Sequence, residues 1–207
     1  MNTNLKHPWV LLSLFISTLS FSASSSADNE RPKPAVPKVT AQVQFTDAIK
    51  EHCGKAYAGK VKVDNQPSAA FTNKSLVMHV MKCEENRVYI PFHVGNDHSR
   101  TWILTHTGSG LSLKHDHRKP SGKEDNLTQY GGHTINAGWP QIQSFPADAF
   151  TQELFANLGL PQSIGNTWHM YIYPEKFTYR LTREGREFSV EFDLTKPIAL
   201  PPTPWGY

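Results

Sequence analysis

Apolar and polar residues alternate along most of this chain with the period of a β-strand. Phe177, Tyr179 and Leu181, for example, share one face of a short segment whose other face is polar. Turn-forming residues separate such segments, as in an antiparallel sheet. We expect strands at residues 55–64, 75–83, 87–95, 100–107, 111–118, 126–135, 141–146, 167–174, 176–183 and 187–194.

Two segments have the spacing of helices instead. The first runs from Thr46, which can cap a helix, to Gly54, and the second runs from Asp148 to Gly159. About ten short strands with few helices are typical of a sandwich or a barrel, and closure into a barrel removes exposed strand edges. The predicted fold is therefore mainly β, a single antiparallel β-barrel with a short N-terminal helix and one late helix.

The N-terminal residues are expected to lie outside this barrel. An uncharged apolar run follows Lys6 and ends in small residues, which predicts a signal peptide at 1–27 with cleavage before Asp28. An uncleaved N-terminal anchor is the alternative. Prolines in 28–44 predict a flexible linker. The barrel would then occupy 45–207 with a proline-rich C-terminal tail, and cleavage would leave no transmembrane segment.

Cysteine usage and charge fit an exported protein. Cys53 and Cys83 are the only two cysteines, and in an oxidising compartment they are expected to form a disulfide. A thiol nucleophile or a metal site is the rival interpretation, but the CxxC spacing that would support either is absent. The net charge is +3 without a long basic run, so nothing indicates a nucleic-acid partner. A periplasmic or secreted location follows.

The densest chemistry lies in LKHDHR, residues 113–118, just after a GSG turn. Pairing around this turn places Trp102 opposite His115 and Arg100 opposite His117. Since the apolar residues of both strands then face the barrel interior, both histidines face inward as well. Asp116 faces outward, and we interpret it as an ordinary surface acid.

The inward side chains are candidate ligand-binding residues. Two histidines two positions apart on one strand can share a transition metal, or one can ligate haem, with a further ligand from another histidine. An inward histidine hydrogen-bonded to a tyrosine or to the backbone is the structural alternative. The predicted ligand site consists of Arg100, Trp102, His106, His115, His117 and Tyr171, of which His115 and His117 are the candidate metal ligands.

Polar residues are also expected to gather at one end of the barrel. A loop that carries Asp97 and His98 leads into the strand of Arg100, so it should lie near His117. With Glu124 and Asp125 these residues would form a polar mouth, although a salt-bridged loop cluster explains them as well.

Short motifs of known chemistry are missing. The chain has no GxSxG, HExxH or phosphate-binding glycine loop, so we assign no catalytic residues. Gly131-Gly132 is instead expected to mark a bulge or a close approach of two backbones.

Three stretches carry a resemblance to other proteins. FHVGNDHSRTWILTHTGSGLSLKHDHR, GKEDNLTQYGG and REFSVEFDL resemble uncharacterised secreted proteins of Gram-negative bacteria, and the similarity covers most of residues 45–206. The resemblance implies an exported bacterial protein and brings no catalytic residues. The order of elements is also similar to that of the calycins, the group of the lipocalins, although GKAY stands where lipocalins have G-x-W.

Three functions stay open at this point. The first is an exported barrel that binds a small ligand, such as haem or a metal, through its inward His, Trp and Tyr residues. The second is an enzyme in which His115 or His117 acts as acid or base and Arg100 holds an anionic substrate. The third is an envelope protein whose barrel interior is filled by side chains. The oligomeric state is left open.

Overall fold

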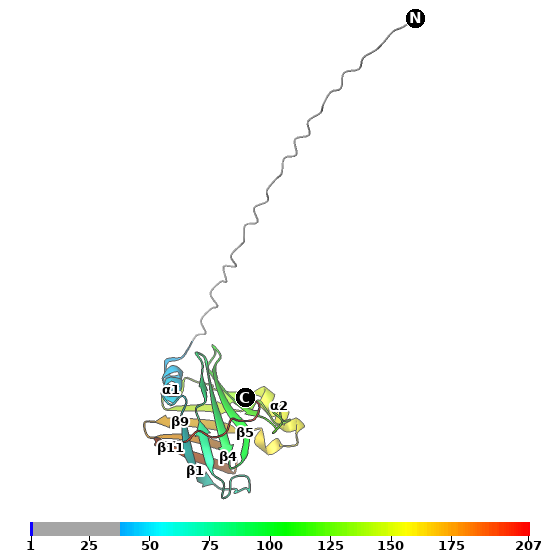
Figure 1. Ribbon diagram of the computed structural model, residues 1–207. Helices are drawn as coiled ribbons and strands as arrows, with labels where there is room; N and C mark the ends of the chain where they lie inside the picture. The colour runs from blue at the N-terminus through cyan, green and yellow to red at the C-terminus, as the bar shows by residue number, and fades with distance from the viewer. Residues whose placement is uncertain (2–37) are drawn as a thin grey trace. The chain divides into compact units, whose positions relative to one another are not determined.

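The computed structural model describes residues 1 and 38–207 of the chain (Figure 1). The predicted signal peptide, apart from Met1, and most of the predicted linker lie outside the described residues. Eleven strands are found in the described part: β1 (Ala56–Asp64), β2 (Leu76–His79), β3 (Lys82–Cys83), β4 (Arg87–Val94), β5 (Asp97–His106), β6 (Leu111–His117), β7 (Tyr130–His133), β8 (Ile142–Pro146), β9 (Thr167–Tyr173), β10 (Lys176–Arg183) and β11 (Arg186–Ile198).

The strands form one antiparallel meander that nearly closes on itself. Their order is β7-β6-β5-β4-β2-β1-β11-β10-β9-β8, and β3 pairs with β4 beside this path. A bridge between Gly132 and Ala147 joins the two ends of the order. The predicted antiparallel barrel is therefore confirmed. The likeness to lipocalins, which have eight strands, stays a prediction.

Glycine permits the close approach at this seam between β7 and β8. A Cβ atom on Gly132 would lie 1.9 Å from the backbone oxygen of Pro146, far closer than a carbon and an oxygen that are not bonded can approach each other. The close backbone approach predicted for the Gly-Gly pair is thus present, and it lies where the barrel closes.

Helix α1 (Thr40–Lys50) covers one end of the barrel. It begins inside the segment 28–44 that the sequence predicts as a linker, and Val39 rather than Thr46 is its N-cap. Thr46 lies within the helix, where its hydroxyl donates to the Gln42 carbonyl at 3.1 Å and contacts His106 Nε2 at 3.0 Å. Because a threonine hydroxyl can bond the carbonyl four residues back, it fits a helix interior as well as a cap.

The second helix begins where the sequence predicts it. In α2 (Ala149–Asn157) the Asp148 carboxylate caps the helix and accepts the Thr151 N–H at 3.0 Å. Phe155 is the buried apolar residue of the helix, whereas Phe150 is exposed. A short 3-10 turn, η1 (Pro161–Ser163), then leads to β9. The chain from α2 to η1 borders the open end of the barrel described below.

A disulfide between Cys53 and Cys83 ties the chain after α1 to β3, as predicted. The two residues are 30 positions apart, and closing a loop of that length stabilises a fold by roughly 3–4 kcal/mol. Disulfides of this kind are typical of proteins in oxidising compartments. Among residues 1 and 38–207, no helix combines the length and the apolar character needed to cross a membrane.

The C-terminal tail, residues 199–207, passes over the outer face of the barrel wall at β4 and β5 (Figure 1). The Trp205 N–H donates to the His98 carbonyl at 3.0 Å. The Tyr207 hydroxyl donates to Asp116 Oδ2 at 2.7 Å. The tail therefore covers part of the wall that strand periodicity alone would leave exposed to solvent.

Candidate functional site

A cavity of about 230 Å³ lies at the end of the barrel opposite α1. Strand β5 connects the two ends, because Arg100 near its start lines the cavity and His106 at its end contacts α1. The cavity walls are mainly aromatic, and the ring-bearing residues from the strands are Phe92, Trp102, Tyr130, Trp168, Tyr179 and Phe188. The interior of this barrel is therefore filled at one end and open at the other.

His115 faces this cavity, with the strand register that the sequence predicts. It pairs with Trp102 across β5 and β6, while Arg100 pairs with His117. His115 Nδ1 donates to the Tyr130 backbone carbonyl at 3.1 Å, so Nε2 is the acceptor for the Tyr179 hydroxyl at 2.9 Å. Burial lowers the pKa of His115 to about 3, which keeps the ring neutral. Both ring nitrogens are thus engaged within the protein.

Stacked rings make the cavity wall rigid. Trp102 stacks on Tyr179 with centroids 4.5 Å apart and on Phe92 with centroids 4.8 Å apart. His115 stacks on Tyr130 at 4.5 Å. Each ring has few rotamers that keep these contacts, so the shape of the cavity is preformed. Such a surface favours an apolar ligand.

Three arginines border the cavity: Arg100, Arg183 and Arg186. Arg100 forms an ion pair with Asp97, and Arg186 pairs with Asp64 at 2.5 Å. Arg183 instead donates to two neutral oxygens, Ser163 Oγ at 3.0 Å and Asn166 Oδ1 at 3.4 Å. The cavity lining contains no Asp or Glu. The opening of the cavity therefore carries positive charge.

Asp116 is not the surface acid that its outward direction predicts. It points to the outer face, but its side chain is only 1% exposed. Arg118 Nε donates to both of its oxygens at 3.0 Å, and Gln129 Nε2 donates at 2.8 Å. The hydroxyls of Tyr207 and Thr128 also donate to this carboxylate. Asp116 fastens the C-terminal tail and the β6–β7 loop to the wall, which is a structural role.

His117 lies between the aromatic cavity and a polar pocket of about 430 Å³. The pocket brings together Asp97, Arg100, His117 and Asp125, as predicted, whereas His98 and Glu124 are not in its lining. Asp97 and His98 belong to β5 and not to a loop before it. Burial, together with the Arg100 charge, lowers the pKa of His117 to about 4. At neutral pH this histidine is therefore a weak base.

Two predicted ligand residues lie away from the cavity. His106 contacts Thr46 beneath α1, at the closed end of the barrel. Tyr171 belongs to the outward set of β9, where its hydroxyl accepts from Arg180 at 3.5 Å. Its neighbours Met170 and Ile172 are the buried ones. The strand period of β9 therefore turns Tyr171 to the outer face, because Met170 and Ile172 occupy the inner one.

The predicted metal site does not fit this geometry. In the described residues, no three His, Cys, Asp or Glu side chains are arranged to hold a metal ion. His115 has no free nitrogen, and His117 Nε2 is hydrogen-bonded to the Tyr130 hydroxyl at 3.1 Å. The structural alternative, histidines bonded to tyrosine and backbone, describes both residues.

Sequence reasoning did not select Tyr130 and Arg183 as cavity residues. Tyr179 alternates with polar neighbours in β10, and this pattern alone makes it a candidate for the cavity wall. Arg183 ends that strand with no local pattern that marks it as a site residue, and Tyr130 lies in a short strand of weak alternation. These two residues could be identified only once the strand order was known.

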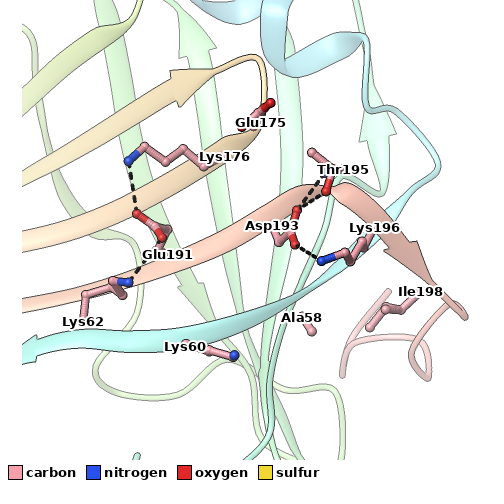
Figure 2. A pocket seen from close by; sticks show the side chains of 10 residues that line it. All are labelled: Ala58, Lys60, Lys62, Glu175, Lys176, Glu191, Asp193, Thr195, Lys196 and Ile198. Carbon is pink, nitrogen blue, oxygen red and sulfur yellow. Dashed lines mark hydrogen bonds and ion pairs between the residues drawn. The ribbon is translucent and has the colours of Figure 1, made fainter.

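A hollow of about 640 Å³ lies on the outer wall where β1, β10 and β11 meet (Figure 2). Lys62 and Lys176 both pair with Glu191, and Lys196 pairs with Asp193 (Figure 2). Because its charges are exposed and largely paired with one another, this hollow offers weak selectivity. We place the candidate site in the smaller aromatic cavity.

Comparison of the chain with protein-family models, curated proteins and solved structures gave no match. The function must therefore be argued from the cavity itself.

Proposed function

We propose that this protein is an exported barrel that binds a small, mainly apolar molecule in the cavity at the open end. The supporting observation is the preformed aromatic wall around Trp102 and Tyr179, which leaves about 230 Å³ free instead of filling the barrel. This volume is below the roughly 300–1,000 Å³ of most ligand pockets, so the ligand is compact. The predicted signal peptide and the disulfide support an exported location.

The other functions have less support. Haem would need a free histidine nitrogen and a larger cavity. Acid-base catalysis at neutral pH would need a histidine pKa near 7, but the pKa values of His115 and His117 lie at about 3 and 4. A purely structural barrel would gain stability from a filled interior, since each buried void loses packing contacts.

Blocking the cavity tests the proposal. A panel of small compounds with an apolar body, some neutral and some carrying one charged group, is screened by quenching of tryptophan fluorescence. The affinity of each compound that binds is then measured by calorimetry. Leu160 lines the cavity, so Leu160→Trp should weaken binding at least about tenfold by occupying the space. Leu158 is 40% exposed and outside the lining, so Leu158→Trp is the matched control and should bind as the unmodified protein does.

Two results would reject the proposal. One is the absence of any binding across the panel by a folded protein. The other is equal binding by the Leu160→Trp and Leu158→Trp variants, which would place the ligand elsewhere. Location is tested separately by cell fractionation with thiol alkylation, where a cytoplasmic protein with free Cys53 and Cys83 would contradict export.

A further inference from the structure

The charge at the opening of the cavity is not balanced. Of the three arginines there, Arg100 and Arg186 have carboxylate partners in Asp97 and Asp64. Arg183 has no Asp or Glu within ion-pair distance among the described residues. One unit of positive charge is therefore left without a partner beside an apolar cavity, where charges are less screened than in water.

The hydrogen bonds of Arg183 leave one edge of its guanidinium unused. Only Nη1 donates to described residues, to Ser163 and Asn166, and these two contacts hold the group at the edge of the cavity. Nε and Nη2 make no hydrogen bond to a described side chain or backbone group. Two parallel N–H groups of this kind match the two oxygens of a carboxylate.

From these observations we infer that the ligand is a small monocarboxylate, with its apolar body against the Trp102–Tyr179 wall and its carboxylate on the free edge of Arg183. This inference rests on the proposed function. A single unpaired arginine favours a monoanion over a dianion such as a phosphate monoester, whose second charge would have no partner. The burial that disfavours an unpaired guanidinium also lowers the pKa of Arg183, with a further contribution from Arg186.

The experiment compares acids with their amides, which share shape and differ in charge. Benzoate, 3-phenylpropionate and octanoate are titrated calorimetrically against the corresponding amides, with phenyl phosphate as the dianion. The best acid should bind at least about tenfold more tightly than its amide, as for a charge-assisted bidentate contact. Its affinity should not change between pH 6 and pH 9, because neither arginine nor the acid titrates there.

Variants assign the preference to one residue. Arg183→Gln should abolish the difference between acid and amide, and Arg183→Lys should retain part of it. Arg87 is exposed, lies outside the cavity and likewise lacks an ion-pair partner in the described chain, so Arg87→Gln is the matched control and should keep the full preference.

The possible outcomes test this inference separately from the proposed function. Equal affinity for acid and amide, tighter binding of phenyl phosphate than of the acids, or an acid preference that survives Arg183→Gln would overturn this inference. Binding of neutral compounds alone would overturn it as well, while the proposed function would stand. Binding of no compound at all would reject the proposed function and this inference together.

Discussion

Acidification from pH 7 to pH 5 is expected to destabilise the fold by at least about 5 kcal/mol, the amount that follows from three buried histidines that the native state holds neutral. Burial lowers the pKa of His115 to about 3, and the pKa values of His93 and His117 to about 4. In the unfolded chain each would titrate near 6.5. The unfolded state therefore binds more protons below pH 6.5, and stability falls as the pH falls.

The magnitude follows from linkage. Between pH 7 and pH 5, protonation of one unfolded histidine with a pKa of about 6.5 contributes about 1.9 kcal/mol, at about 1.36 kcal/mol for each pKa unit. Three histidines contribute about 5–6 kcal/mol, which we reduce slightly because His117 is partly accessible. The native pKa values matter little here, since pH 5 lies above all of them. Carboxylates titrate near pH 4 in the unfolded chain and contribute little in this window.

Urea unfolding followed by tryptophan fluorescence at pH 7, 6 and 5, at constant ionic strength, measures this loss. His93→Gln removes one of the three groups, so it should reduce the loss between pH 7 and pH 5 by about 2 kcal/mol, whatever it does to stability at pH 7. A loss of less than about 1 kcal/mol in the unmodified protein would refute the reasoning, because the histidines would then be free to take up protons in the folded state.

Three further changes test contacts that hold the barrel together: those of the C-terminal tail, of the seam between β7 and β8, and of the disulfide. Tyr207→Phe removes one hydrogen bond to Asp116 and should cost about 1 kcal/mol in urea unfolding, less than a fully buried bond to a charged group, because Tyr207 as a residue is 44% exposed. No change would mean that the tail does not hold this contact in solution. Gly132→Ala should cost more than about 2 kcal/mol or prevent folding, whereas Gly165→Ala, with no atom within 4 Å of its Cβ position, should be neutral; equal melting temperatures would refute the close approach. Reducing the disulfide should lower the free energy of unfolding by roughly 3–4 kcal/mol, and unchanged stability in dithiothreitol would contradict its role.

The local parts of the fold could be predicted from the sequence because they depend on few residues. The GSG turn and a period of two suffice for the register that pairs Trp102 with His115, and this register is confirmed. The cap at Asp148 and the disulfide are local or compositional signals of the same kind. Each of these features is determined within one hairpin, one helix end or one pair of cysteines.

Asp116 shows where such reasoning stops. The period of the strand correctly predicts that its side chain points to the outer face of the barrel. A side chain on that face is exposed to solvent, however, only where no other segment covers it. The tail that buries it is 91 residues away along the chain at Tyr207. A proline-rich segment has no periodicity that indicates its docking surface, so the burial of Asp116 depends on a contact that no local pattern contains.

The cavity depends on a difference between the two ends of the barrel. At one end Phe45 and Ile49 of α1 are buried and fill the interior. At the other end the loop between β1 and β2 places Phe71 against Phe188, with ring centroids 4.6 Å apart, and space remains beneath it. The alternation of inward aromatic residues along the strands is compatible with a barrel whose interior is filled and equally with one whose interior is open. A filled barrel and an open barrel differ in whether a helix such as α1 fills each end of the interior. Arg183 lies at the end that α1 does not fill, and for that reason it borders a cavity instead of being an ordinary surface charge.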